Sequence, residues 1–245
     1  MKYPVAIIDY GIGGLGLYKL IHDEYPKLPL LYFSDSGEVP YGKLSRTKLR
    51  SRLEKVFGFL TKQGVEHIVV ACHSASSVVL PTDTNVTGLR SQTVKAVAKR
   101  KPKSVGIIGG GRTIRSGYYR RELNRLGIKT GQRVAQPLSV LVERGEIEGP
   151  DVEVAVAKIV KPLSSYDSIL LACTHYPVLS DVIKRHTNAR LIDPVDELYK
   201  SIPFRLDKKL TGPTVFITTG DVKLMKDAAR KAFAVSIRKV RKVKL

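Results

Sequence analysis

Two cysteines are the residues of this sequence best suited to chemistry. Cys72 and Cys173 are the only cysteines among 245 residues, and His73 and His175 lie one and two residues beyond them. This spacing contains no CxxC or HxxxH pair, the patterns that hold a zinc ion. A disulfide between them is the alternative, but a reducing cytosol argues against it. Two thiols with neither metal nor disulfide partner are either buried core side chains or reagents.

The surroundings of the two cysteines repeat along the chain. Ile68–Ser74 reads IVVACHS and Ile169–His175 reads ILLACTH, about 100 residues later. A second repeat pairs Val5–Gly14 with Val105–Gly111, although buried parallel strands resemble one another and this pair carries less weight. In open α/β sheets, binding sites gather beyond the carboxyl ends of the strands. Two similar lobes packed edge to edge would present both thiols to one cleft, where they could move a proton on and off a carbon acid.

The elements that must position these thiols follow from the hydrophobic pattern. Short apolar, β-branched runs alternate with helical patterns, which predicts an α/β fold with mainly parallel strands. The basic stretch Lys99–Lys103 is the best candidate for a hinge or lobe boundary. Two helices are predicted from apolar faces, one formed by Leu49, Leu53, Val56, Phe57 and Leu60, the other by Val152, Val156, Ile159, Val160 and Leu163. The predicted strands are Val5–Ile8, Leu30–Phe33, Ile68–Val70, Val105–Ile108, Ile169–Leu171, Leu191–Ile192 and Val215–Ile217.

A glycine-rich segment after the first predicted strand suggests a different enzyme. Gly11–Gly16 fits the G-x-G-x-x-G fingerprint of dinucleotide-binding folds, and Asp35 lies where an acid would bind the ribose. Asp9 argues against this hypothesis, because its carboxylate would face the pyrophosphate held at the helix N-terminus. An NAD enzyme is therefore the second enzyme hypothesis.

The composition is that of a folded, cytoplasmic protein. The chain is 43% apolar, and no apolar run approaches the roughly 20 residues of a membrane span. The apolar part of the N-terminal segment is too short for a signal peptide.

The formal net charge of +20 makes polyanions, nucleic acid included, partners to be considered. The basic residues are spread along the chain without interleaved aromatic residues, which favours a solvated basic surface over a stacking platform for single strands. Affinity for nucleic acid is then non-specific.

Five segments carry chemistry that the predicted elements do not explain. They are Asp9–Gly14 (DYGIGG), Val39–Gly42 (VPYG), Ala71–Ser76 (ACHSAS), Thr113–Ser116 (TIRS) and Ala172–Pro177 (ACTHYP). These segments resemble the glutamate racemase family of the aspartate/glutamate racemase superfamily, in the family's order and at similar spacing. Pro137–Gly145 and Val215–Asp221 match as well, so that the resemblance covers nearly the whole chain.

The resemblance implies two similar doubly wound α/β lobes with mainly parallel sheets and an active site in the cleft between them. The C-terminal segment would return to the first lobe. The first lobe would then comprise residues 1–98 and 206–245, and the second residues 99–205.

The resemblance also implies an isomerase, a cofactor-independent racemase that interconverts L- and D-glutamate without pyridoxal phosphate or metal. Its product would supply peptidoglycan synthesis, and with it cell-wall biogenesis and cell shape. The partners expected are a small-molecule substrate and, as a further option, a second copy in a homodimer.

Residue by residue, the resemblance assigns roles to the matching positions. Cys72 and Cys173 would exchange protons with opposite faces of the α-carbon, assisted by Asp9 and His175 respectively, with Glu143 as a further acid beside Cys173. Each assistant also has a structural alternative, since Asp9 could cap the following helix and His175 could be a supporting residue. The substrate would be bound by Asp9, Tyr10, Pro40, Tyr41, Gly42, His73, Ser74, Thr113, Thr174 and His175.

The chain departs from the family pattern around the first cysteine. Tyr10 replaces a serine and would shrink the pocket, whereas His73 replaces an asparagine and, if protonated, would lower the pKa of a neighbouring thiol. Ser74 replaces threonine, and Val86–Ser91 lacks a glutamate and a proline of the family pattern. These changes leave two alternatives, a racemase for another acidic amino acid such as aspartate, or a non-catalytic binding protein with nucleic-acid affinity.

Overall fold

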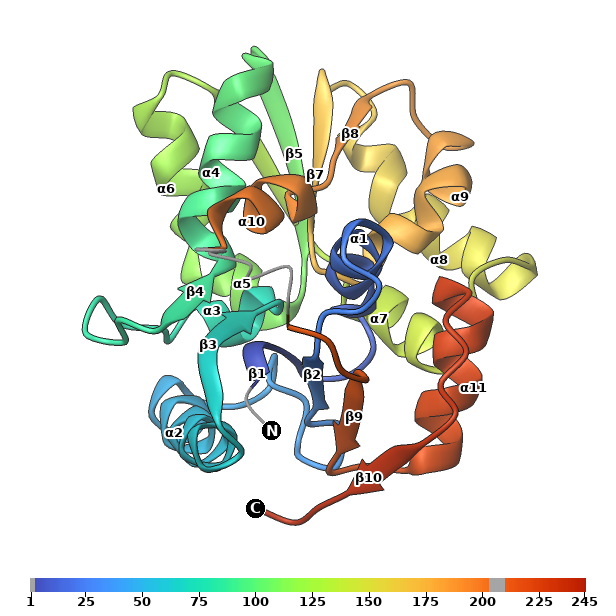
Figure 1. The fold of residues 1–245 in the computed structure, drawn as a ribbon. Coiled ribbons are helices and arrows are strands. Elements are labelled where there is room, and N and C mark those ends of the chain that lie inside the picture. Colours follow the sequence, from blue (N-terminus) through green and yellow to red (C-terminus); the bar gives the residue numbers. More distant parts are fainter. Residues whose placement is uncertain (1–2, 203–209) are drawn as a thin grey trace.

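Two parallel β-sheets form the two lobes of the molecule (Figure 1). The computed structural model describes residues 3–202 and 210–245. All strand pairs within these residues are parallel. One sheet has the order β10-β9-β2-β1-β3-β4 and the other β6-β5-β7-β8. The strands are β1 (Tyr3–Asp9), β2 (Leu30–Ser34), β3 (Val65–Val70), β4 (Val86–Gly88), β5 (Ser104–Gly109), β6 (Lys129–Val134), β7 (Ser168–Ala172), β8 (Arg190–Ile192), β9 (Val215–Thr218) and β10 (Val240–Lys242).

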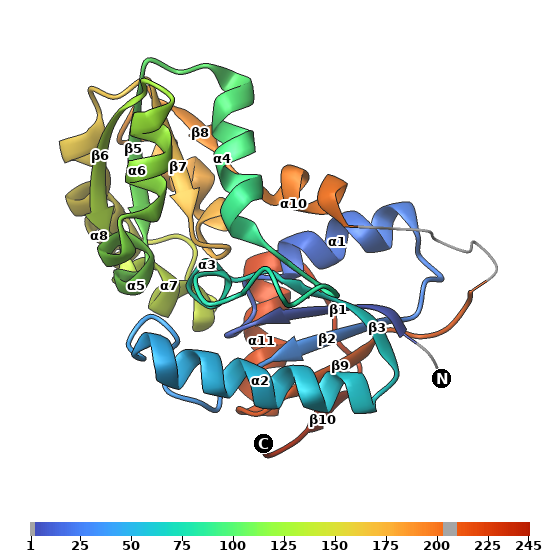
Figure 2. The same ribbon diagram turned by 90° about the vertical axis from the view of Figure 1, so that its left-hand side faces the viewer.

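Helices cover both sheets, so that the predicted α/β fold with two doubly wound lobes is confirmed (Figure 2). The α-helices are α1 (Leu15–Glu24), α2 (Arg46–Lys62), α3 (His73–Ser76), α4 (Leu89–Arg100), α5 (Gly111–Ser116), α6 (Tyr118–Arg125), α7 (Gln136–Glu143), α8 (Pro150–Val160), α9 (Ser180–Lys184), α10 (Val195–Ser201) and α11 (Val222–Phe233), and the 3₁₀ helices are η1 (Lys161–Leu163) and η2 (Tyr176–Leu179).

The amphipathic patterns of the sequence form the expected helices. The side chains of Leu49, Leu53, Val56 and Leu60 are fully buried beneath α2, whereas Phe57 is half-buried. Ser45 caps this helix by accepting a hydrogen bond from the backbone N–H of Lys48. The second predicted face begins in α8 and continues into η1, and all five of its residues are buried.

All seven predicted strands are present, and β4, β6 and β10 were not predicted. Each of these three lies at the edge of its sheet. Strand β6, with the sequence KTGQRV, has no buried residue, and β4 and β10 contain three residues each. Edge strands with this exposure lack the apolar run by which a buried strand is recognised.

The chain passes from the first sheet to the second through α4 and returns after α10. The proposed division between residues 98 and 99 falls in the last turn of α4, and Lys99–Lys103 spans the end of this helix and the turn into β5. The second division, between residues 205 and 206, lies outside the described residues. Strands β9 and β10 extend the first sheet beside β2, and α11 follows β9. The domain limits remain a proposal.

None of the helices within residues 3–202 and 210–245 has the length and apolar character of a membrane-spanning segment.

Candidate active site

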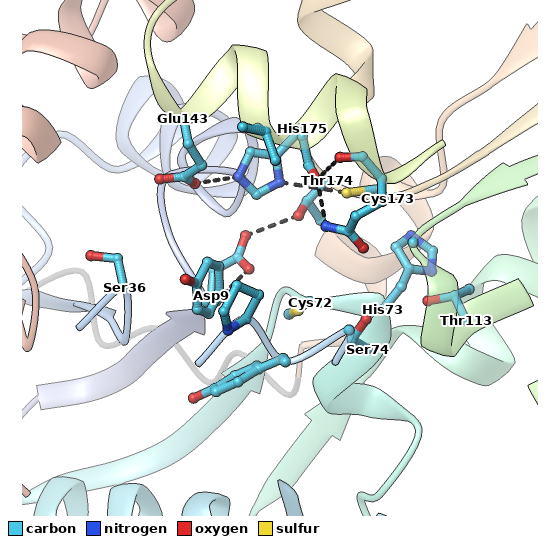
Figure 3. A pocket seen from close by; sticks show the side chains of 18 of the residues that line it. Asp9, Ser36, Cys72, His73, Ser74, Thr113, Glu143, Cys173, Thr174 and His175 are labelled. Atoms are coloured by element: carbon cyan, nitrogen blue, oxygen red, sulfur yellow. Dashed lines mark hydrogen bonds and ion pairs between the residues drawn. The ribbon is translucent and has the colours of Figure 1, made fainter. Parts of the chain in front are cut away.

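A pocket of about 320 Å³ lies between the lobes, where β1 and β3 of one sheet and β7 of the other end (Figure 3). All thirteen residues predicted for the site line it. They are Asp9, Tyr10, Pro40, Tyr41, Gly42, Cys72, His73, Ser74, Thr113, Glu143, Cys173, Thr174 and His175.

Both thiols are free and line this pocket. Cys72 stands two residues after β3, at the N-terminus of the short helix α3, and is 8% exposed. Cys173 directly follows β7 and is more accessible. Figure 3 places the two sulfur atoms on different sides of the pocket. The alternative of a disulfide between them is therefore wrong.

Cys173 belongs to a chain of three acid–base groups. Its Sγ atom lies 3.5 Å from Nδ1 of His175, and Nε2 of the same imidazole forms an ion pair with Oε1 of Glu143. The Glu143 carboxylate also accepts a hydrogen bond of 2.8 Å from the backbone N–H of Ile12. Burial alone would lower the pKa of His175, but Cys173 and Glu143 outweigh it and raise that pKa well above its ordinary value. The arrangement can hold an imidazolium beside a thiolate.

Asp9 is buried and lies between the Cys72 side and the Cys173 side of the pocket (Figure 3). Its carboxylate accepts hydrogen bonds from the backbone N–H of Tyr10, at 2.6 Å, and from the hydroxyl of Thr174, at 2.9 Å. Burial raises the pKa of Asp9, although the charge of His175 opposes this shift. Asp9 is thus a better proton acceptor than an ordinary aspartate.

The pKa of Cys72 is raised well above its ordinary value by burial and then by the negative charge of Asp9, against the opposing effect of the backbone N–H groups of Ala75 and Tyr10. Cys72 therefore rests as a thiol at neutral pH. Asp9 does not activate this cysteine by stabilising its thiolate. Any assistance from Asp9 must come from proton transfer.

These pKa shifts predict how Cys72 reacts with iodoacetamide, because only the thiolate is nucleophilic. Alkylation of Cys72, followed by peptide mass spectrometry, should become fast only above about pH 8.5, the ordinary pKa of a thiol. Replacing Asp9 by asparagine removes the negative charge that opposes ionisation and should move this rise to lower pH. The matched control is Asp193→Asn, since Asp193 is a partly buried carboxyl group outside this pocket. An unchanged profile in Asp9→Asn would contradict the electrostatic coupling.

The glycine-rich loop after β1 makes room for side chains of the second lobe. A Cβ atom at Gly11 would lie 1.8 Å from Oε1 of Glu143, and one at Gly13 would lie 2.4 Å from the hydroxyl oxygen of Thr174. The backbone at these positions must therefore be glycine for Glu143 and Thr174 to approach.

The structure argues against the dinucleotide hypothesis, because Asp35, the residue expected to bind the ribose, is paired within the protein. Asp35 is buried and forms a bidentate ion pair with Arg52, with N···O distances of 2.6 and 2.8 Å, and it accepts a hydrogen bond from the Tyr41 hydroxyl. It is part of the packing beneath the pocket and does not face a ribose.

His73 does not carry the positive charge that would let it lower the pKa of a neighbouring thiol. Burial lowers its pKa to about 3, so its imidazole is neutral and supplies no positive charge to a thiolate. Its Nδ1 atom lies 2.7 Å from the hydroxyl of Tyr119. Among the residues that the structure describes, neither its buried Nε2 atom nor the buried Thr113 hydroxyl has a hydrogen-bond partner. Both residues line the pocket, and polar groups of this kind normally have a partner.

Tyr10 contributes its ring to the pocket wall. Its hydroxyl donates a hydrogen bond of 3.2 Å to the backbone carbonyl of Glu38, and its ring centroid lies 5.4 Å from that of Tyr41.

Eight further residues line the pocket and were not predicted. Three of them follow from the period of α7, because Gln136, Ser139 and Val140 share one helix face with Glu143. The amide of Gln136 donates to the Ser139 hydroxyl at 3.0 Å. The other five new residues are Ser36, Gly110, Arg144, Ala172 and Leu224.

No cluster of three or more His, Cys, Asp or Glu side chains within the described ranges is arranged to hold a metal ion.

Comparison with known proteins identifies relatives over most of the chain. The model of the Asp/Glu/hydantoin racemase family matches residues 17–202. A glutamate racemase of Exiguobacterium sibiricum is 34% identical over 222 residues, which cover 84% of this chain and 81% of that protein. Another of Shouchella clausii is 37% identical over 194 residues, 75% of this chain and 70% of that one. The crystal structure of glutamate racemase from Thermus thermophilus in complex with β-chloro-D-alanine has a TM-score of 0.87 and 29% identity, and the match covers 100% of this chain and 98% of that one.

Proposed function

Because the chain belongs to the glutamate racemase branch of the Asp/Glu/hydantoin racemase family and is an isomerase, we propose that it interconverts L- and D-glutamate by proton transfer between two thiols. The observation that carries the mechanism is that two free thiols line one pocket with different acid–base neighbours. The D-glutamate produced would supply peptidoglycan synthesis.

In one direction, the Cys173 thiolate removes the α-proton while His175 holds the positive charge beside it. The Cα–H bond breaks, the proton moves to Sγ of Cys173, and the electron pair stays on the α-carbon and its carboxylate. The Cys72 thiol then gives its proton to the opposite face and becomes a thiolate. The opposite enantiomer reacts by the reverse sequence, which returns both cysteines to their starting states. The raised pKa of Cys72 suits this role, because a neutral thiol is needed as the acid.

The Glu143–His175 ion pair supports this assignment of the Cys173 side. A weak carbon acid gives up its proton only to a base held close to it, and the imidazolium offsets the charge of that base. Asp9, whose pKa is raised by burial, is placed to accept or return a proton between turnovers. The Thr174 hydroxyl, which donates to Asp9, connects the two sides of the site.

Two polar atoms without partners in the pocket support an anionic substrate. The Thr113 hydroxyl and, in the tautomer with hydrogen on Nε2, the imidazole of His73 can each donate a hydrogen bond to a carboxylate. Arg144 lines the same pocket and adds a positive charge. Charge-assisted bonds of this kind favour a carboxylate over a neutral group.

The proposed function is tested by adding purified protein to L-glutamate in D₂O and following both enantiomers by chiral chromatography. D-glutamate should form, with deuterium at its α-carbon and no added cofactor. L-aspartate is assayed in parallel, because Tyr10 and His73 alter the pocket. Faster exchange of aspartate than of glutamate would transfer the assignment to that substrate, and absence of α-proton exchange with either would contradict a racemase.

Replacing Thr113 by valine should weaken glutamate binding without destabilising the fold. The change removes a hydroxyl that is unpaired in the free protein, so the free energy of unfolding should stay the same or rise by about 1 kcal/mol. The KM for glutamate should rise by about tenfold, because a hydrogen bond to a carboxylate is lost.

A matched control for this variant is Thr187→Val. The Thr187 hydroxyl accepts a hydrogen bond from the backbone N–H of Ala189 and lies outside the pocket. This variant should be less stable but have an unchanged KM. An unchanged KM in Thr113→Val would show that Thr113 does not bind the substrate.

A further inference from the structure

A second cavity, of about 420 Å³, lies beside the active site and is lined mainly by arginines. Its lining residues are Leu44, Arg46, Ser77, Arg90, Arg112, Arg115, Ser116 and Arg121. We call this site the arginine cavity. Arg46 is the first residue of the 17-residue helix α2, so the positive end of that helix adds to the charge of the guanidinium groups.

Within the part of the chain that the structure describes, the positive charge of the arginine cavity is not balanced by ion pairs with acidic side chains. Over residues 3–202 and 210–245, none of its five arginines forms an ion pair with an Asp or Glu side chain. The neighbouring arginines of α2 differ in this respect, since Arg50 pairs with Asp83 and Glu54, and Arg52 pairs with Asp35. Arginines elsewhere on the same helix are thus matched with acids, whereas those of the cavity are not.

Four of the five guanidinium groups, those of Arg90, Arg112, Arg115 and Arg121, contact neutral partners, which restrict their positions without cancelling their charge. Arg112 donates to the Ser77 hydroxyl and to the backbone carbonyl of Leu44, each at 2.9 Å, and Arg121 donates to the carbonyl of Ser116 at 2.8 Å. The Arg90 guanidinium carbon lies 3.7 Å from the ring centroid of Tyr118, and the buried Nε atom of Arg90 has no hydrogen-bond partner within residues 3–202 and 210–245. Partial burial, followed by the charges of Arg46 and Arg115, lowers the pKa of Arg112. An anion in the cavity would relieve this repulsion.

The arginine cavity is built from both lobes. Arg46 and Leu44 belong to the first lobe, at the start of α2, whereas Arg112 and Arg115 lie on α5 of the second (Figure 2). Arg115 donates to the backbone carbonyl of Gly42, a residue of the active-site wall. A ligand in the cavity would therefore hold the 40–46 segment against α5.

We propose that the arginine cavity binds a small molecule through a diphosphate or longer phosphoanhydride group, and that the bound group bridges the two lobes. Five adjacent cations, four of them held by neutral partners, require several adjacent negative charges, which such a group carries on a short chain. Guanidinium groups bind phosphate oxygens in a bidentate manner. The concave shape favours a small anion over the extended backbone of a nucleic acid, which would follow an exposed basic stripe.

Isothermal titration calorimetry with inorganic pyrophosphate tests the proposal at about 0.15 M ionic strength. Pyrophosphate should bind at least about tenfold more tightly than orthophosphate. The double variant Arg46→Gln, Arg121→Gln should weaken pyrophosphate binding by about tenfold or more, because two charges leave the cavity. The matched control is Lys48→Gln, Arg120→Gln, which removes the same net charge from exposed residues on the same two helices outside the cavity. It should retain binding within about twofold.

Three further measurements discriminate the ligand class. ADP should bind as tightly as pyrophosphate, since both carry a phosphoanhydride; binding of ADP without pyrophosphate would overturn the proposal. A single-stranded oligonucleotide that displaces pyrophosphate, and whose affinity falls equally in the cavity variant, would assign the arginines to nucleic acid instead. Hydrogen exchange of the backbone amides of residues 41–46 should slow when pyrophosphate is bound. Equal losses in the two double variants, or unchanged exchange at these amides, would contradict a bridging ligand.

Discussion

Replacing Cys72 by serine, and separately Cys173 by serine, should each reduce glutamate racemisation by roughly 10²–10⁴-fold, the range for loss of a positioned acid or base. A serine hydroxyl occupies nearly the same space but does not ionise near neutral pH, so it serves neither as a base nor as an acid of suitable strength. The loss should be seen in both directions for each variant. Chiral chromatography and circular dichroism of the folded proteins are the measurements.

Racemisation alone does not show which cysteine removes the proton from which enantiomer. L- and D-glutamate have equal free energies, so the equilibrium constant is one and kcat/KM must be equal in the two directions for any variant. An irreversible reaction is free of this constraint. Glutamate with chloride on its β-carbon can lose the α-proton to one thiolate and then expel chloride, and the resulting enamine hydrolyses to 2-oxoglutarate and ammonia.

Each single cysteine variant should keep this elimination for one α-enantiomer and lose it for the other. The retained enantiomers should be opposite in Cys72→Ser and Cys173→Ser, because each remaining thiol faces one side of the α-carbon. The control is Ser36→Ala, a change in the same pocket that should leave racemisation within a few-fold, roughly the effect of one hydroxyl. Near-normal racemisation after loss of either thiol would refute the two-thiol mechanism.

Most of the strands that the sequence predicted share one physical property, burial. Strands β1, β3, β5 and β7 are central, and their apolar runs made them visible, as did the cysteines that follow β3 and β7. The edge strands β4, β6 and β10 were missed because exposure leaves them without a distinctive pattern. Central strands can thus be predicted from local composition. Of the four edge strands in the described residues, only β8, which ends in the buried Ile192, had a predictable pattern.

Distances between the lobes could not be predicted from local sequence. The resemblance indicated Glu143, but its ion pair with His175 depends on how α7 packs against η2, the short helix that His175 precedes. The fit of Gly11 against Glu143 depends on the meeting of both lobes. The state of His73 was not predictable for the same reason, because its neutrality follows from burial beside Tyr119, a residue of α6. The sequence therefore indicates which residues reach the pocket, and the packing of the lobes decides their protonation.

Loss of the Glu143–His175 ion pair should have the second large effect on catalysis. The variant Glu143→Gln should lower kcat for glutamate by about 10- to 100-fold. Glutamine keeps the size of the side chain and an oxygen for the backbone N–H of Ile12, but it removes the negative charge. Glu143 is one of the groups that raise the pKa of His175, so the variant should have a lower His175 pKa. The imidazolium would then lose its proton at lower pH, and the alkaline limb of the kcat profile should move to lower pH. Glu146→Gln, an exposed change three residues away, is the matched control.

The same variant should separate the two sides of the active site. Glu143 acts through His175, so elimination from the enantiomer whose proton goes to Cys173 should fall with kcat. Elimination from the other enantiomer depends on Cys72 and should change by only about threefold or less, a small electrostatic effect. Racemisation would still fall equally in both directions, because each direction needs both thiols. If both eliminations fell together and the alkaline limb did not move, Glu143 would stabilise the pocket as a whole rather than control the charge of His175.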